Sequence, residues 1–313
     1  MDVENQTRVS KFIFSGLTDN RILSPILFLF FLLVYLITVI GNIGMMTMVY
    51  TKSHLHTPMY CFLGNLSLVD LLYSSVVTPK MLSDLISESK SISIEGCAIQ
   101  FFSFASMAVT EALLLADMSY DRYVAICKPL NYVSIMTQKK CVWLILLTFF
   151  IGFFQSSVQT GCIFHLEFCD SYYIDHFYCD FPPLFKLSCS ETFPCHLTSI
   201  VIVYCFGGGS LMIILVSYSF IVYTILNIKS SKGRSKAFST CSSHLTCVSI
   251  LYGTVFFIYL RPSSSDFEKQ DKVVAVFYTV IIPMLNPLIY SFRNKDVQNL
   301  SLERCKKKSR LQN

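Results

Sequence analysis

Apolar residues gather into seven long runs, which shorter polar segments separate. Each run is about as long as the ~20 residues that an α-helix needs to cross the hydrocarbon core of a bilayer. Open strands would leave backbone polar groups without partners in lipid, so the runs predict helices. We place the predicted spans at residues 25–50, 59–82, 97–123, 140–160, 196–226, 236–260 and 273–291. The sixth run is the least apolar, because Ser235–His244 is polar.

Composition agrees with a membrane protein. Of the 313 residues, 53% are hydrophobic and 14% are charged, whereas a soluble domain carries about a quarter charged residues. Lys and Arg gather between alternate spans and in the tail, whereas the loop at 161–195 has one Lys against five acids. Because cytosolic loops are enriched in Lys and Arg, we expect the N-terminus outside and the C-terminus in the cytosol. The net charge of +5 then reflects topology, and no nucleic-acid partner is predicted.

A single all-α domain at 1–313 follows from this pattern. It comprises an extracellular segment at 1–24, the bundle at 25–291 and a cytosolic tail at 292–313, whose basic start predicts a short amphipathic eighth helix on the lipid surface. Asn5 begins an Asn-Gln-Thr glycosylation sequon on the expected outer side. Gly207–Gly209 in the fifth span would permit bending or close helix packing, and we favour packing.

The 13 cysteines divide by compartment. Most are interpreted as small apolar packing residues within the spans. We assign four to the outer side, which are Cys97, Cys169, Cys179 and Cys189. An oxidising compartment favours two disulfides there, although four cysteines permit three pairings.

The third span carries charges that lipid would reject. Asp121-Arg122 ends the span, and Glu111 lies 11 residues before Arg122, about 16 Å along a helix. At 100° per residue Glu111 and Arg122 share one face, which must be the inner face of the bundle. Asp117 points about 140° away from Arg122 and is expected to reach water or a neighbouring helix.

Polar residues also recur at the middle depth of other spans. Asp70 in the second span lies at a depth similar to that of Glu111, and Asn42 and Asn286 lie in the first and seventh spans. Two buried acids require a cation, a shared proton or a hydrogen-bonded core with one acid protonated. These interpretations stay open on the residues alone.

Several motifs occur in a fixed order along the chain. They are Leu55-His-Thr-Pro-Met-Tyr60, Met118-Ser-Tyr-Asp-Arg-Tyr-Val-Ala-Ile-Cys127, Ser217-Tyr218, Lys236-Ala-Phe-Ser-Thr-Cys241 with Ser243-His-Leu245, Tyr252-Gly253 and Pro283-Met-Leu-Asn-Pro-Leu-Ile-Tyr290. The set closely resembles odorant receptors, a branch of the rhodopsin-like G-protein-coupled receptors. Ser119 replaces the Ala that is usual there, and Thr57 and Pro283–Asn286 favour the tetrapod-type second class.

The resemblance implies a receptor that binds small, neutral, largely apolar odorants and activates a stimulatory G protein to raise cAMP. It implies a plasma-membrane protein of olfactory sensory neuron cilia, with Cys97–Cys179 and Cys169–Cys189 disulfides. Asp70 and Glu111 match a sodium site, with sodium as an allosteric modulator and no other cofactor. Asp121 is expected to hold the charge of Arg122 in the resting state.

The resemblance also implies two sets of site residues. The ligand pocket in the outer half of the bundle would be lined by Phe104, Ala105, Ala108, Val109, Ile202, Val203, Phe206, Val255, Phe256, Tyr259 and Thr279. Its only polar side chains would be the hydroxyls of Tyr259 and Thr279. Activation and coupling would use Asp121, Arg122, Tyr123, Tyr218, Tyr252, Asn286, Pro287 and Tyr290.

Three other functions compete with an odorant receptor. A receptor for an amine lacks its counter-ion, because Phe104 stands where amine receptors carry an aspartate, whereas a peptide receptor stays open. A transporter would suit the buried acids, but the chain shows no repeated half. An intramembrane enzyme is disfavoured, since neither a Gly-x-Ser-x-Gly nor a His-Glu-x-x-His motif is present.

Overall fold

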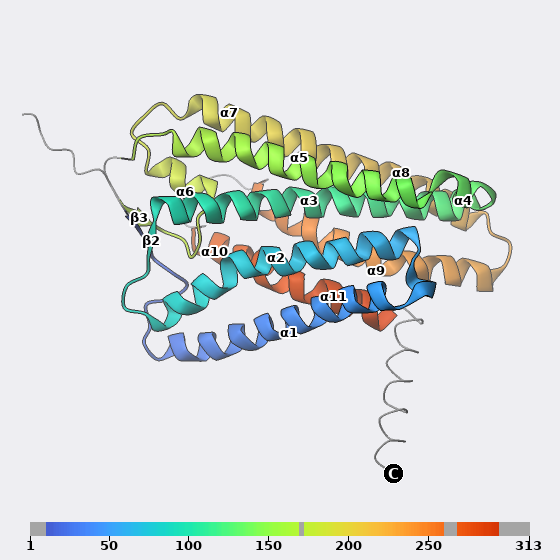
Figure 1. Ribbon diagram of the computed structural model, residues 1–313, viewed down its shortest axis with the longest axis horizontal. Coiled ribbons are helices and arrows are strands. Elements are labelled where there is room, and N and C mark those ends of the chain that lie inside the picture. Colours follow the sequence, from blue (N-terminus) through green and yellow to red (C-terminus); the bar gives the residue numbers. More distant parts are fainter. Residues whose placement is uncertain (1–10, 169–171, 260–267, 294–313) are drawn as a thin grey trace, which may run out of the picture.

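The computed structural model describes residues 11–168, 172–259 and 268–293. Its long helices run side by side as one bundle (Figure 1). They are α1 (Leu23–Thr51), α2 (Pro58–Ile86), α3 (Ile94–Cys127), α5 (Gln138–Phe164), α7 (Phe193–Ile202), α8 (Gly209–Leu226), α9 (Ser231–Tyr259), α10 (Glu268–Val276) and α11 (Ile282–Arg293). The π-helix Val203–Gly208 joins α7 to α8, and the π-helix Phe277–Ile281 joins α10 to α11.

The prediction of seven helical spans is confirmed. Within the described residues, six helices are long and apolar enough to cross a bilayer, and α9 supplies the seventh if its two parts are counted as one span. Those parts, Ser231–Ser239 and Cys241–Phe257, meet at a bend of 40°. The bend falls in the stretch whose polar sequence made the sixth run the weakest. The predicted eighth helix and Asn5 lie outside the described residues.

Helix α3 occupies the middle of the bundle, packed against α2, α5, α8 and α9. Its close approach to α5 depends on Gly152, where an added Cβ would lie 2.3 Å from Thr110 Oγ1. Small residues permit such a close approach of helices in membranes, where van der Waals packing and not the hydrophobic effect drives helix association. By contrast, the interpretation of Gly207–Gly209 as a packing site is wrong, because added Cβ atoms there would meet nothing within 4 Å. These glycines instead lie at the junction of the π-helix and α8.

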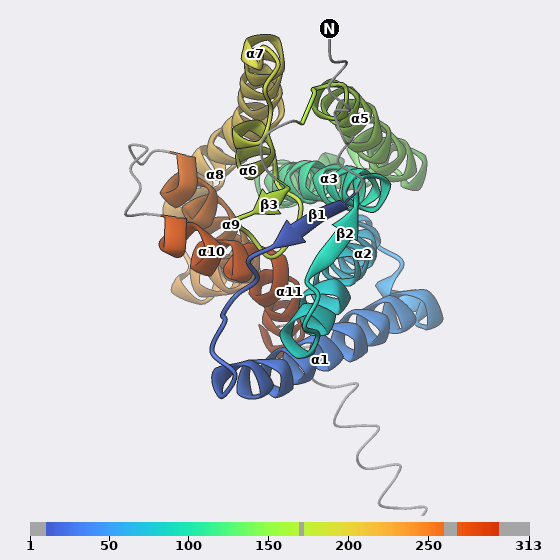
Figure 2. The ribbon, with the colours of Figure 1, turned by 90° about the vertical axis from the view of Figure 1, so that its left-hand side faces the viewer.

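A three-stranded sheet covers one end of the bundle, which we call the sheet end (Figure 2). Strand β1 (Lys11–Phe14) lies between β2 (Ser91–Ser93), which is antiparallel to it, and β3 (Tyr173–Ile174), which is parallel. Phe12 and Phe14 of β1 are buried beneath the sheet. No strand was expected here, so the sheet is an addition to the all-α fold.

Short helices lie in the connections, among them the 3-10 helices Ser53–Leu55 and Pro129–Asn131 and two short α-helices. Helix α4 (Tyr132–Ile135) lies between α3 and α5, at the end opposite the sheet. Helix α6 (Phe181–Lys186) lies in the long loop at the sheet end, and the carboxylate of Asp180 caps it by accepting a hydrogen bond from the Phe181 amide at 2.9 Å. A carboxylate satisfies one of the free amides that every helix start exposes.

Candidate functional site

The long loop at the sheet end is anchored inside the mouth of the bundle. The predicted Cys97–Cys179 disulfide is confirmed, with the Cα atoms 5.6 Å apart. Gln100 of α3 reinforces it, since its Nε2 donates to the Val76 carbonyl at 3.2 Å and its Oε1 accepts from the Cys179 amide at 3.0 Å. The loop residue Tyr178 is consequently fully buried.

The structure contains a further disulfide that was not predicted from the sequence. Cys162, at the end of α5, is bonded to Cys195, at the start of α7. The assignment of only four cysteines to the outer side was therefore incomplete, because Cys162 and Cys195 lie at span ends and were interpreted as packing residues. Cys189 is disulfide-bonded as well, whereas Cys169, its predicted partner, lies outside the described residues.

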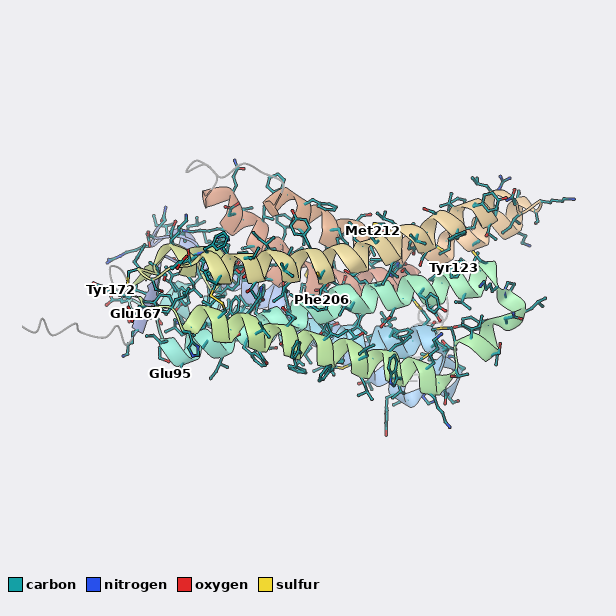
Figure 3. All side chains as sticks on the ribbon, turned by 90° about the horizontal axis from the view of Figure 1, so that it is seen from above. Glu95, Tyr123, Glu167, Tyr172, Phe206 and Met212 are labelled. Atoms are coloured by element: carbon teal, nitrogen blue, oxygen red, sulfur yellow. A yellow bond between two sulfur atoms is a disulfide. The ribbon has the colours of Figure 1, made fainter. Side chains whose placement is uncertain are left out.

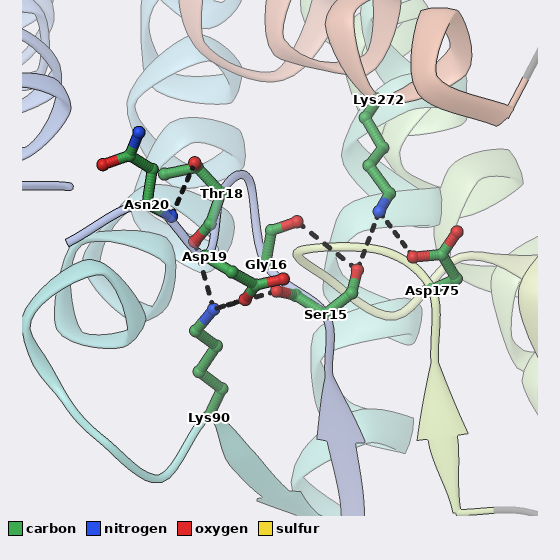
Figure 4. Close-up of polar contacts among 8 residues, drawn as sticks. All are labelled: Ser15, Gly16, Thr18, Asp19, Asn20, Lys90, Asp175 and Lys272. Carbon is green, nitrogen blue, oxygen red and sulfur yellow. Dashed lines mark hydrogen bonds and ion pairs between the residues drawn. The ribbon is translucent and has the colours of Figure 1, made fainter. Parts of the chain in front are cut away.

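Two lysines fasten the N-terminal segment over the bundle (Figure 4). Lys90 donates to the Ser15 carbonyl at 3.0 Å and pairs with Asp19 at 2.9 Å. Lys272 of α10 donates to Ser15 Oγ at 2.8 Å and pairs with Asp175 at 2.5 Å. Partial burial alone would raise the pKa of Asp175, but hydrogen bonds from Lys272 and Ser15 hold that pKa below its usual value. The N-terminal segment is thus linked to Lys90 before β2, to Lys272 of α10 and, through Lys272, to Asp175 of the long loop.

An aromatic cluster lies beneath this cover. The ring of Phe104 lies 4.9 Å from the ring of Tyr73, 5.0 Å from that of Tyr178 and 6.1 Å from that of Tyr278. The Tyr178 hydroxyl donates to Asp180 Oδ2 at 2.6 Å, and the Tyr278 hydroxyl is shared between the Tyr178 oxygen and Asp180 Oδ2, the latter at 3.3 Å. Burial raises the pKa of Asp180, although the Tyr178 hydroxyl and the Phe181 amide oppose the shift.

Tyr73, Tyr178, Tyr278 and Asp180 were all missed by the sequence analysis. One signal was available, since Tyr178 and Asp180 flank a cysteine that had been assigned to the disulfide with α3. Tyr278 immediately precedes Thr279, which was selected. The structure therefore puts more polar groups beside Phe104 than the two hydroxyls that were expected.

The predicted pocket residues belong to α3, α7, α9 and the two π-helices. Phe104 and Thr279 are buried, and Thr279 Oγ1 donates to the Ala275 carbonyl at 2.7 Å within its own helix. Ala105, Ala108, Val109, Ile202, Val203, Phe206 and Val255 are partly buried. The π-helix Val203–Gly208 packs against α3, and Figure 3 shows the labelled Phe206 between the helices there. Phe256 is 42% exposed, and the side chain of Tyr259 lies outside the described residues.

The two buried acids, Asp70 of α2 and Glu111 of α3, lie beside the amide of Asn286 of α11. Asn286 Nδ2 lies 3.1 Å from both carboxylate oxygens of Asp70 and 3.4 Å from Glu111 Oε1. The prediction that Glu111 faces the interior is confirmed, since it is 1% exposed. Asn42 instead donates to the Thr38 and Pro283 carbonyls, both at 3.0 Å. Within the described residues no third His, Cys, Asp or Glu completes a metal-binding group.

At the opposite end, Asp121 and Arg122 do not pair as expected. Both residues are described, and no ion pair joins them. Asp121 instead accepts a hydrogen bond from the Tyr132 hydroxyl of α4 at 2.9 Å. Successive positions on a helix point apart, which explains why a local partner replaces Arg122. Arg122 Nε has no hydrogen-bond partner in the described part of the chain.

The other predicted coupling residues surround this region or lie deeper in the bundle. The Tyr123 ring lies 5.7 Å from that of Phe220, and the Tyr252 and Ser210 hydroxyls are hydrogen-bonded at 2.7 Å. Tyr290 is buried, and Pro287 lies where a Cβ at Gly41 would approach it to 3.2 Å.

Asp117 belongs to the interface between α3 and α5. Its Oδ2 accepts a hydrogen bond from Thr148 Oγ1 at 3.1 Å. The expectation that it reaches a neighbouring helix is therefore met. The pair adds a polar connection to the packing at Gly152, further along the same two helices.

The sequence of this chain matches known proteins along nearly its whole length. A family model described as olfactory receptor matches residues 31–307. Olfactory receptor 5B21 of Mus musculus is 52% identical over 300 residues, which cover 95% of this chain and 93% of that protein. Olfactory receptor 5B12 of Homo sapiens is 50% identical over 300 residues, 95% of each chain. The chain therefore belongs to the olfactory receptor family of G-protein-coupled, multi-pass membrane receptors, and it is a receptor for odorants and not an enzyme.

Proposed function

We propose that this receptor detects small, neutral, largely apolar volatile molecules in the sheet-end half of its bundle. The observation that carries the proposal is the Phe104 cluster, where the rings of Phe104, Tyr73 and Tyr278 gather against Tyr178 of a loop that a disulfide and Gln100 hold in place. Apolar ligands gain affinity by burial against such rings, at about 25 cal/mol per Å².

The polar groups of the cluster favour a neutral ligand. Asp180 already accepts hydrogen bonds from Tyr178, Tyr278 and the Phe181 amide. A carboxylate with these donors does not require a cationic ligand, and Phe104 offers no counter-ion at the position used by amine receptors. The phenol hydroxyls supply hydrogen-bonding positions for an alcohol, aldehyde or ketone oxygen.

We further infer the orientation and the signalling route. Disulfides form in oxidising compartments, so the sheet end with Cys97–Cys179 and Cys162–Cys195 would face outward. The segment at 1–24 would then be extracellular, the tail at 292–313 cytosolic, and Arg122 would face a stimulatory G protein that raises cAMP. Thr57 and Pro283–Asn286 support the tetrapod-type second class, and olfactory sensory cilia are the proposed location.

A cAMP reporter in cells that display the receptor tests this function. An odorant panel should give responses to neutral apolar volatiles, and Arg122→Ala should abolish them at unchanged surface expression. Phe104→Ala should weaken the responses by removing the ring at the centre of the cluster. Responses confined to charged amines, or full signalling by Arg122→Ala, would contradict the proposal.

A further inference from the structure

A groove on the bilayer-facing side of the bundle separates α5 from α7 and the π-helix that follows it. It has a volume of about 340 Å³, and its walls include Gln155, Val158, Leu197, Val201, Ile202 and Phe206. Leu197 and Val201 are 50% and 51% exposed, so the groove opens where lipid surrounds the helices. Figure 3 shows Phe206 labelled between the α7–α8 helix and its neighbours.

Gln155 lines the groove and carries an unused hydrogen-bond acceptor. The residue is 1% exposed, and its Nε2 donates to the Ala105 carbonyl of α3 at 3.1 Å. Because a carbonyl can only accept, the atom facing Ala105 must be the amide nitrogen. The other atom, Oε1, is buried and has no hydrogen-bond partner among the described residues.

The residues that line the groove limit which molecules can donate a hydrogen bond to this acceptor. Gln155 and Thr198 are the polar residues of its lining, and the Thr198 hydroxyl already donates to the Pro194 carbonyl at 2.8 Å. A buried water usually needs two to four polar partners, which this lining supplies poorly. An amphiphile that carries one hydroxyl on an apolar body would satisfy Oε1 and fill the apolar walls together.

The backbone beside the groove is irregular, which agrees with a binding role. The chain forms a π-helix at Val203–Gly208 directly after α7, and such segments frequently mark functional sites. Ile202 and Phe206 line the groove and are also predicted pocket residues. A molecule in the groove would therefore contact a wall that is shared with the proposed odorant pocket.

We propose that this groove is a second binding site, which takes apolar alcohols from the bilayer and holds their hydroxyl on Gln155 Oε1. The alcohol donates its O–H to the amide oxygen, and its hydrocarbon part lies along Val158, Leu197 and Val201. An ether or alkane of the same length lacks the donor and binds less well. The site shares Ile202 and Phe206 with the proposed odorant pocket but lies apart from the Phe104 cluster, and its occupancy can be measured without a signalling readout.

Photolabelling of the purified full-length receptor in nanodiscs tests the proposal without a cAMP readout. The probe is a decanol that carries a diazirine in its chain, and the matched control probe is its methyl ether. Mass spectrometry should find the decanol on residues 154–158 and 197–206 in preference to the ether. Equal labelling by the two probes would overturn the proposal, as would even labelling of all bilayer-facing helices.

Two matched pairs of variants locate the site. Gln155→Met should lower the apparent affinity for the decanol probe about tenfold, the loss expected for one hydrogen bond to a buried amide. Gln159→Met changes another buried glutamine of α5 outside the groove and should leave labelling unchanged. Equal behaviour of these two variants would remove Gln155 from the site.

The second pair fills the groove while leaving Gln155 intact. Val201→Trp should block labelling, whereas Val216→Trp, at an equally exposed valine of α8 outside the groove, should not. This pair keeps the test decisive if Gln155→Met does not fold. Undiminished labelling of Val201→Trp would overturn the proposed position. Because labelling is read directly, its failure is distinguishable from a failure of the proposed odorant response.

Discussion

Tyr218 of α8 and His244 of α9 are hydrogen-bonded through the Tyr218 hydroxyl and His244 Nδ1, 2.7 Å apart. On the other side of the ring, His244 Nε2 lies 3.0 Å from the Leu115 carbonyl of α3. A carbonyl only accepts, so Nε2 carries the proton and Nδ1 accepts from Tyr218. One neutral imidazole thus connects three helices next to Arg122.

His244→Phe should raise basal cAMP. The substitution keeps a ring of similar shape but removes both connections, so that α9 is no longer tied to α8 and α3 in the resting arrangement. A net contribution of about 1 kcal/mol per hydrogen bond would shift the resting equilibrium several-fold. Thr246→Val is the control, because its hydroxyl donates only within α9. Unchanged basal cAMP in His244→Phe at equal surface expression would exclude a restraining role.

Tyr278→Phe should impair responses to hydrogen-bonding odorants more than responses to hydrocarbon-like ones. The Tyr278 hydroxyl belongs to the group formed with Tyr178 and Asp180 beside Phe104. Loss of one hydrogen bond to a ligand would raise the half-maximal concentration about tenfold.

Thr279→Val is the matched control for the odorant series. The Thr279 hydroxyl donates to the Ala275 carbonyl, so its removal should affect both classes of odorant little and equally. Dose–response curves for an alcohol and its parent hydrocarbon in both variants measure the difference. Parallel shifts for the two odorants in Tyr278→Phe would place its hydroxyl outside the ligand contact.

The contrast between Glu111 and Asp180 shows how far the sequence predicts this site. Glu111 was placed correctly, because the cost of a charge in lipid and the period of a helix determine which face it occupies. Asp180 was missed because it lies in a loop, whose course depends on a disulfide, Gln100 and the sheet. No local pattern encodes such contacts between segments distant in sequence.

Strand β1 and the Cys162–Cys195 disulfide were missed for related reasons. Lys11–Phe14 alternates exposed and buried side chains, but four residues are too few to reveal a strand without its partners β2 and β3. Cys162 and Cys195 lie at helix ends, where an error of a few residues in a span boundary changes their compartment. The apolar runs were more reliable, since the thickness of the bilayer determines their length.

The buried imidazole of His176 should make the receptor less stable in acid. Burial and the positive charge of Lys272 lower the pKa of His176 from 6.5 to about 3. The unfolded chain therefore binds a proton more readily than the folded chain between those values. The associated stability is fully present above pH 6.5 and falls as the pH drops toward 3, by about 2 kcal/mol between pH 6.5 and 5.

Thermal unfolding of the purified receptor between pH 7 and pH 5 measures this effect. His176→Phe should reduce the loss of melting temperature on acidification, because the phenyl ring retains the stacking on Phe177 without a titratable group. His165→Phe is the control, since His165 is exposed and lies on the same side of the molecule at the end of α5. An acid response that is the same in wild type and His176→Phe would contradict the assignment.

Sodium should modulate the receptor through Asp70 and Glu111. The Asn286 amide lies within 3.4 Å of both carboxylates, and two acids held this near one donor require a further positive charge. We expect that replacing sodium by choline in the medium raises basal cAMP, because the ion would stabilise the resting packing of α2, α3 and α11. Glu111→Gln should remove the sodium dependence by deleting one of the two charges. Asp117→Asn, which changes an acid of α3 outside this group, should preserve it. If wild type responds equally in sodium and choline, a shared proton supplies the positive charge instead.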